Sequence, residues 1–168
     1  MTQSDYHWYA VYTNPRAEKK TYTLLKQKGF EVYLPLLKVL KQWSDRKKWV
    51  EEPLFKSYLF VRVSEREYTQ VLQTQGVVKY VSFSGKAAII RDDQIETIKL
   101  LLISEEELEI VDHQFKKGEF VQIKAGPFLG LRGELLDLQH SKRFLVRFDQ
   151  LGKSIILNVP SVYLEPLF

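Results

Sequence analysis

Apolar and aromatic residues in the first hundred positions fall into short extended runs separated by stretches with helical spacing. Runs rich in aromatic and β-branched residues predict strands at 7–13, 30–40, 54–63, 77–83 and 87–90. Helix start and stop signals, with apolar residues three and four positions apart, predict helices at 14–29, 64–75 and 92–104. The order β-α-β-β-α-β-α is close to the ferredoxin-like split βαβ arrangement.

The strand at 54–63 is unusual because its centre is apolar at every position. Tyr58 and Phe60 share one face of the strand, and Leu59 and Val61 share the other. This pattern is typical of a central strand covered on both sides, or of a strand whose second face binds a partner. The pattern alone leaves open which set is core.

Residues 115–168 have a different spacing of apolar runs and turn signals. Strands are predicted at 120–124, 133–138, 144–148 and 154–159, with turns at Gly126-Pro127, His140-Ser141 and Leu151-Gly152. Short, regularly spaced strands without a helical stretch predict a small β-barrel.

Charge divides the chain at the same place. Residues 1–104 hold 17 Lys and Arg against 11 Asp and Glu, residues 105–114 hold five acids and no base, and residues 115–168 hold eight bases against five acids. Two basic blocks joined by an acidic stretch are typical of two modules with a solvated connector. We therefore expect a domain at 1–104, an acidic linker at 105–114 and a β-barrel domain at 115–168.

The densest basic segment lies between residues 14 and 48, which hold ten Lys and Arg and three acids. The first turn of a helix is expected to carry Arg16, Lys19 and Lys20. A hairpin tip between Trp43 and Trp49 is expected to carry Arg46, Lys47 and Lys48. Such patches bind phosphates without reading sequence. The alternative is that these residues form an ordinary basic surface that binds no nucleic acid. The predicted nucleic-acid-binding residues are Arg16, Lys19, Lys20, Arg46, Lys47 and Lys48.

Residues for catalysis or metal binding are scarce. The chain has no cysteine, and its three histidines, His7, His113 and His140, match no metal-ligand spacing. It contains no phosphate-binding glycine loop and no nucleophile-elbow motif. No apolar run approaches the ~20 residues that cross a bilayer. The sequence predicts a cytoplasmic protein that is not an enzyme, with no catalytic residue, cofactor, metal or membrane partner.

Several segments resemble NusG-type transcription elongation factors. Trp8–Thr13, Pro53–Val61 and Gly76–Val78 leading to Phe83 are similar to the amino-terminal (NGN) domain of that family. Lys117–Val121, followed by the glycine-rich turn at 126–130 and Gly133, resembles the KOW module that ends those proteins. The resemblance covers nearly the whole chain in order. It implies an α+β fold in which a ferredoxin-like NGN domain precedes a small SH3-like KOW β-barrel.

Within this family, the chain is more similar to specialised paralogs than to the general factor. Gln42–Lys48 and Pro53–Phe55 resemble the UpxY-like antiterminators of capsular polysaccharide loci and, more distantly, RfaH. This likeness implies a factor dedicated to a particular operon. The chain departs from the family where Lys56-Ser57 follows Phe55, since much of the family has Pro directly after that Phe.

The resemblance also implies partners. The NGN domain of this family packs an apolar patch on the clamp helices of RNA polymerase, bridges the DNA cleft and suppresses pausing. The KOW module binds Rho or a small-subunit ribosomal protein, and we expect the chain itself to be a monomer. The matching polymerase-binding residues are Tyr58, Phe60, Phe83 and Phe55, and the matching KOW-partner residues are Phe128 and Leu129.

Each of these roles has an alternative. The aromatic residues of the NGN segment would have no contact role if they fill the core, and Phe128 and Leu129 would have none if they fold over the end of the barrel. For the whole chain, the alternatives are a ribosomal or RNA-binding KOW protein without polymerase binding, and an uncharacterised enzyme of ferredoxin-like fold.

Overall fold

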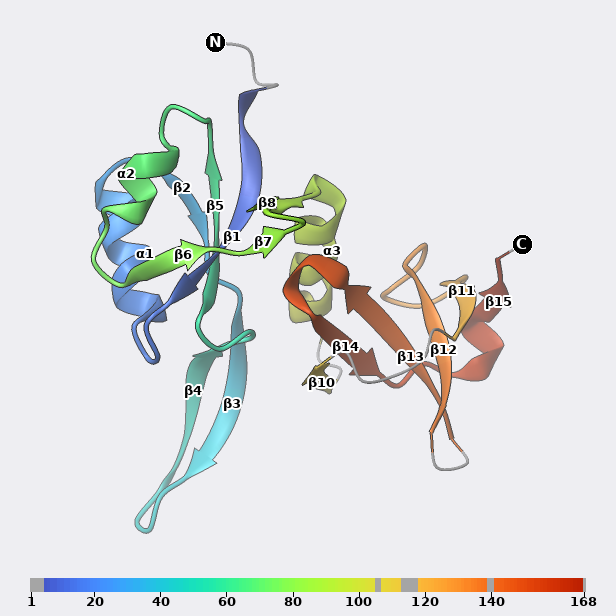
Figure 1. The fold of residues 1–168 in the computed structure, drawn as a ribbon. Coiled ribbons are helices and arrows are strands. Elements are labelled where there is room, and N and C mark those ends of the chain that lie inside the picture. The colour runs from blue at the N-terminus through green and yellow to red at the C-terminus, as the bar shows by residue number, and fades with distance from the viewer. Residues whose placement is uncertain (1–4, 105–106, 113–117, 139–140, 168) are drawn as a thin grey trace. The chain divides into compact units, whose positions relative to one another are not determined.

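The computed structural model describes residues 5–104, 107–112, 118–138 and 141–167 of the 168-residue chain. The chain divides into two compact units, Met1–Ile95 and Glu96–Phe168, which are described separately (Figure 1). The first unit combines a sheet with helices and the second is rich in strands. Together they confirm the α+β fold that the sequence predicts.

A five-stranded antiparallel sheet forms the first unit. Its strands are β1 (His7–Thr13), β2 (Glu31–Tyr33), β5 (Tyr58–Val63), β6 (Val77–Tyr80) and β9 (Ile89–Ile90). The order is β2-β5-β1-β6, and β9 pairs with Trp8 and Tyr9 of β1. Along β5, Phe60 lies opposite Ala10 and Tyr58 lies opposite Tyr12. β1 therefore has hydrogen-bonded neighbours on both sides.

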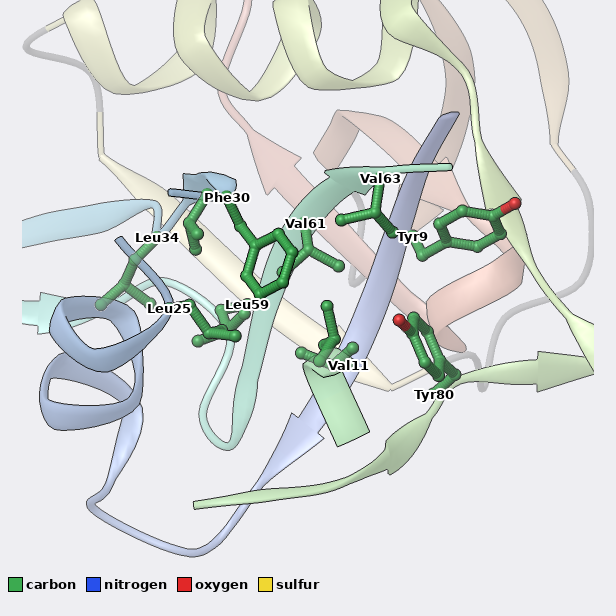
Figure 2. Packing of buried hydrophobic residues seen from close by; sticks show 11 residues of the cluster. Tyr9, Val11, Leu25, Phe30, Leu34, Leu59, Val61, Val63 and Tyr80 are labelled. Atoms are coloured by element: carbon green, nitrogen blue, oxygen red, sulfur yellow. The ribbon is translucent and has the colours of Figure 1, made fainter. Parts of the chain in front are cut away.

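The main core of this unit lies on one face of the sheet, where α1 (Glu18–Gln27) and α2 (Tyr68–Leu72) pack. Figure 2 shows alternate side chains of β1 and β5 pointing into it. Leu25 of α1 and Val71 of α2 are fully buried in the same cluster. The sheet residues of the cluster are Tyr9, Val11, Val32, Leu59, Val61, Val63 and Tyr80.

The opposite face of β1 and β5 is covered as well. Trp8, Ala10 and Phe60 are buried on that side, and Ala10 and Phe60 have no exposed surface. β5 is therefore a central strand covered on both faces, which confirms the first of the two readings of its apolar pattern.

α1 begins at Glu18, later than the predicted start at residue 14. Arg16 takes a left-handed conformation (φ 63°), which prevents a continuous helix from starting at Asn14. Ala17 is the N-cap residue, and its N–H donates to the carbonyl of Asn14 (3.0 Å). Arg16 thus lies in the loop before α1, and the prediction that it shares the first helical turn with Lys19 and Lys20 is wrong.

Two hairpins and a helix complete the first part of the chain. The predicted strand at 30–40 is interrupted at Pro35, so β2 is followed by a separate strand. The longer hairpin projects away from the sheet in Figure 1, and the shorter one turns at Ser84-Gly85, both at positive φ (54° and 80°). The elements are β3 (Leu36–Gln42), β4 (Lys47–Pro53), β7 (Ser82–Phe83), β8 (Lys86–Ala87) and α3 (Asp92–Ile103).

The second unit contains a six-stranded antiparallel sheet in the order β10-β14-β13-β12-β11-β15. Short 3-10 turns η2 (Asp149–Leu151) and η3 (Ser161–Tyr163) connect its last strands. Val121, Phe144 and Ile155 are among the buried residues on one face of the strands. The predicted turn at His140-Ser141 lies partly outside the described residues, and Ser141 begins a strand. The strands are β10 (Leu108–Asp112), β11 (Glu119–Ile123), β12 (Arg132–Leu138), β13 (Ser141–Phe148), β14 (Lys153–Leu157) and β15 (Leu164–Pro166).

The structure differs from the predicted acidic linker at residues 108–112, which form β10 and pair with β14 along their whole length. The acids of this strand are held by bases of neighbouring strands: Arg143 pairs with Glu109 (3.0 Å), and Lys153 pairs with Asp112. Local charge suggested a solvated connector because these partners lie more than 30 residues away. Of the other linker positions, Glu107 is exposed and in no regular element, and 105, 106, 113 and 114 lie outside the described residues.

A buried ion pair ties β12 to β13. Glu134 is 3% exposed and accepts hydrogen bonds from Arg147 Nε (2.7 Å) and Nη2 (3.1 Å). The N–H of Gly118 donates to the same carboxylate (3.0 Å). The hydrogen bonds that Arg147 donates to Glu134 raise the pKa of the Arg147 guanidinium above its usual value.

Candidate functional site

The four residues predicted to contact polymerase do not form one exposed patch. Phe83 on β7 is 65% exposed, and Tyr58 at the start of β5 is half-buried. Phe60 and Phe55 are buried, and the Phe60 ring lies 6.4 Å from that of Phe55 and 6.2 Å from that of Tyr33. The prediction that Phe60 and Phe55 are exposed contacts is therefore wrong for this structure, since both faces of β5 are covered.

Tyr12 is an aromatic neighbour of Tyr58 that the sequence did not single out. The two residues are directly paired across β1 and β5, with ring centroids 4.8 Å apart. Lys79 Nζ lies 5.5 Å from the centroid of the Tyr12 ring. Only the strand register brings these three side chains together, so no local signal in the sequence could have found them.

The turn before β5 is held by α1. Ser57, where the chain departs from the family pattern, has a left-handed backbone (φ 64°). Its N–H donates to Glu18 Oε1 (2.8 Å), and its carbonyl accepts from the N–H of Thr13 (2.9 Å). Glu18 is 6% exposed. One carboxylate at the start of α1 therefore fixes the turn that places Phe55 and Tyr58.

Replacing Glu18 with alanine should lower the free energy of unfolding by about 1–3 kcal/mol, because the Ser57 N–H would lose its acceptor in a partly buried site. The measurement is urea unfolding followed by tryptophan fluorescence. Glu18→Gln is the matched control, because its amide oxygen can still accept the bond, and it should cost less. Equal losses in both variants would mean that the carboxylate charge, rather than the hydrogen bond, stabilises the turn.

The predicted nucleic-acid-binding residues are all exposed and lie in two segments, one at the start of α1 and one at the tip of the β3–β4 hairpin. Lys19 Nζ donates to the carbonyl of Glu51 on β4 (2.6 Å), which links α1 to the β3–β4 hairpin. Lys20 follows it on α1, and Arg16 lies in the preceding loop. The remaining three, Arg46, Lys47 and Lys48, are at the hairpin tip and form no ion pair with any residue that the structure describes.

The hairpin tip is a four-residue turn. The N–H of Trp43 donates to the carbonyl of Arg46 (2.8 Å), and the Arg46 guanidinium carbon lies 5.8 Å from the centroid of the Trp43 ring. Below the turn, Lys41 lies directly opposite Lys48. Lys41 forms an ion pair with Glu52, and its hydrogen bond lowers the pKa of that carboxyl. The tip thus has an excess of positive charge.

The two residues predicted for the KOW partner have opposite environments. Phe128 is 3% exposed, so it packs in the interior, as expected if it has no contact role. Leu129, in contrast, is 66% exposed. Gly126 and Gly130 on either side adopt positive φ (86° and 88°), which turns the loop sharply. Tyr163 of η3 lies against this loop, 3.4 Å from the position of a Cβ on Gly126. No local pattern in the sequence points to Tyr163, because it comes from a turn more than 30 residues away.

Within 5–104, 107–112, 118–138 and 141–167, no group of three or more His, Cys, Asp and Glu side chains is arranged to hold a metal ion. In the same residues, no helix has the length and apolar character needed to span a bilayer.

Known proteins similar to this chain were found by sequence and by structure. The family profile described as "Transcription termination factor nusG" matches residues 6–99. The transcription termination/antitermination protein NusG of Chlamydia pneumoniae is 28% identical over 149 residues, which cover 82% of this chain and 81% of that protein. The protein of the same name from Borreliella burgdorferi is 25% identical over 180 residues, covering 95% and 98%.

A solved structure described as "Domain interaction in Thermotoga maritima NusG" is similar over 98% of this chain and 99% of its own, with a TM-score of 0.53 and 22% identity. At this identity the likeness concerns the fold, in which an NGN domain is followed by a β-rich, KOW-like region.

Proposed function

The chain belongs to the NusG family of transcription factors, and from this premise we propose that it acts on transcribing RNA polymerase. In this proposal the first unit binds the clamp helices and suppresses pausing, and the second unit recruits another partner. The family is one of transcription factors and not of enzymes. The observation that supports the polymerase contact best is the 65% exposure of the Phe83 side chain on the β7–β8 hairpin.

We assign the polymerase contact to Phe83 as the main anchor and Tyr58 as a second one. Exposed aromatic side chains supply much of the binding energy when they enter a partner's groove. The Tyr58 ring packs against the ring of Tyr12, and part of its surface stays exposed. Phe60 and Phe55 are assigned to packing beneath Tyr58, because both are buried.

The remaining contacts follow from the same premise. The basic residues of α1, its preceding loop and the β3–β4 hairpin are placed toward DNA in the elongation complex. Leu129 is placed in the contact with Rho or a small-subunit ribosomal protein. The junction between the two domains is placed after α3, with β10 in the KOW domain. Dedication to one operon, such as a polysaccharide locus, is supported by Gln42–Lys48, and the factor is taken to be a cytoplasmic monomer.

A ribosomal or RNA-binding KOW protein remains the alternative. In that case residues 118–167 would carry the function and the first unit would have no partner. The family match at residues 6–99 favours the first proposal, because it covers the first unit.

Phe83→Ala should weaken binding to RNA polymerase at least about tenfold while the free energy of unfolding changes by less than ~0.5 kcal/mol, because the ring is mostly in solvent. The measurement is titration of labelled polymerase with the purified full chain. Val162→Ala is the control: Val162 is 71% exposed but lies in the second unit, and polymerase binding should be unchanged. Unchanged binding by the Phe83 variant would contradict the assignment.

Reversing charge at Lys47 and Lys48 should weaken binding to DNA and reduce its dependence on salt, because fewer counterions are released. The slope of log K against log salt for duplex DNA should fall by about 1.8 if both lysines contact phosphate. The control reverses Arg91 and Lys99, which are exposed, pair with Asp93 and Glu96, and change the net charge equally. An equal slope for the two double variants would remove the hairpin from the DNA contact.

A further inference from the structure

The two faces of the β3–β4 hairpin differ in chemistry. Strand pairing places Leu40 directly opposite Trp49 on one face. Both are exposed, Leu40 by 48% and Trp49 by 65%. Lys47, two positions from Trp49 on the same strand, shares this face, and so does Lys38, two positions from Leu40. Glu51, two positions from Trp49 on the other side, also shares this face and lies directly opposite Lys38. The exposed indole ring is thus flanked by Lys47 toward the tip and by the Lys38–Glu51 pair toward the base of the hairpin.

A second aromatic group lies at the tip. Trp43 is 44% exposed, and its ring is approached by Arg46. All three exposed cations of the tip, Arg46, Lys47 and Lys48, lack an ion-pair partner among the described residues. Lys48 also lies directly opposite Lys41, whose ion-pair partner is Glu52, so the carboxylate of Glu52 is engaged by Lys41 and not by Lys48. The hairpin therefore favours an anionic ligand that also presents flat apolar surfaces.

Cross-strand packing accounts for only part of the Trp49 environment. Contact between an aromatic residue and the aliphatic residue opposite it stabilises a hairpin, yet Leu40 leaves Trp49 mostly uncovered. The surrounding charge disfavours an apolar protein groove, because lysines would have to be desolvated there. Nucleic acid combines phosphates with flat bases. In a duplex the base faces are stacked on each other, so only a single strand can offer one to an indole.

We propose that the β3–β4 hairpin binds single-stranded DNA by stacking a base on Trp49, with Lys38 and Lys47, which share its face, holding the adjacent phosphates. This inference rests on the proposed function, which places the hairpin toward DNA in the elongation complex. It adds a ligand class and a stacking residue to a surface otherwise assigned to phosphate contact alone.

The test measures binding of the full chain to a labelled 12-nucleotide oligo(dT), to a 12-base-pair duplex and to an abasic 12-mer of the same charge, by fluorescence anisotropy. Trp49→Ala should weaken oligo(dT) binding roughly 5- to 150-fold, the range for loss of one stacked base. It should leave duplex and abasic binding unchanged. Trp49→Phe should recover part of the loss, because it keeps a ring face.

Two controls separate stacking from damage to the hairpin. Leu40→Ala breaks the same cross-strand pair without removing the indole, and should retain oligo(dT) binding. In a Trp43→Phe background only Trp8, which is 7% exposed, and Trp49 remain as tryptophans. Quenching of tryptophan fluorescence by oligo(dT) in that background therefore reports on Trp49, and quenching is expected.

The possible results are distinguishable. Three results would overturn the stacking site while leaving the DNA contact in place. Trp49→Ala could weaken binding to the single-stranded, duplex and abasic oligonucleotides equally. Alternatively, Leu40→Ala could lose as much oligo(dT) binding as Trp49→Ala, or oligo(dT) could fail to quench the fluorescence of Trp49. Tighter binding to oligo(rU) than to oligo(dT) would overturn the assignment to DNA. If the full chain binds none of these oligonucleotides in a salt-dependent way, the proposed DNA contact itself fails.

Discussion

Replacing Phe60 with alanine is expected to lower the free energy of unfolding of the first unit by about 3–5 kcal/mol, the usual cost of truncating a fully buried phenylalanine. Phe60 has no exposed surface, and the centroid of its ring lies 6.4 Å from that of Phe55 and 6.2 Å from that of Tyr33. Alanine would leave a cavity on a face of β5 that is covered and cannot easily collapse. Because native domains are stable by only ~5–15 kcal/mol, a large share of the variant could be unfolded at 37 °C.

Tryptophan fluorescence measures this loss separately from events in the second unit, because Trp8, Trp43 and Trp49 all lie in the first unit. The fluorescence midpoint in urea should fall, and polymerase binding per folded molecule should persist. Phe83→Ala is the matched control with the opposite expectation, since its ring is 65% exposed. A stable Phe60→Ala variant that no longer binds polymerase would place Phe60 at the contact surface.

The pair Phe60 and Phe83 illustrates what the sequence could predict. Alternation correctly placed Tyr58 and Phe60 on the face of β5 opposite Leu59 and Val61. It could not tell an exposed face from a covered one, because both faces carry residues of equal apolarity. Burial depends on what packs against the strand from distant parts of the chain. Phe83 is exposed because it lies on a two-residue strand beside a tight turn.

The start of α1 and the position of β10 escaped prediction for a related reason. Asn14-Pro15 is a good local signal for a helix start, but Arg16 adopts a left-handed backbone and Glu18 is used to hold the Ser57 turn. The acids at 108–112 predicted a solvated linker, but they form ion pairs with bases on β13 and β14. Local propensity was overridden in each case by partners more than 30 residues away.

The candidate site was only partly accessible from sequence. Clustering of lysines identified the hairpin tip, because charge is visible residue by residue. The stacking role of Trp49 required the register that places it opposite Leu40, two positions from Lys47 on the same face. A one-residue slip of that register would move every side chain of β4 to the other face, so the site depends on a property that no single strand encodes.

Glu134→Gln is expected to destabilise the second unit by about 3–5 kcal/mol, because it leaves the Arg147 guanidinium in a largely buried position without its counterion. The two side chains are 4% and 12% exposed, so water can replace the lost carboxylate only poorly. The amide would also turn an N–H₂ group toward either Arg147 or the Gly118 N–H, both of which are donors. Replacing both residues with leucine should recover much of the loss, because no unpaired charge remains.

Thermal unfolding followed by far-ultraviolet circular dichroism, with tryptophan fluorescence recorded in parallel, would test this prediction. The dichroism transition of the second unit should move to lower temperature while the fluorescence transition of the first unit stays in place. Glu109→Gln is the control, because the Arg143–Glu109 pair is more exposed (27% and 52%) and should contribute at most ~1 kcal/mol. If both single variants melt alike, the buried pair does not stabilise the second unit more than a surface pair does, and the apolar double variant should then bring no recovery.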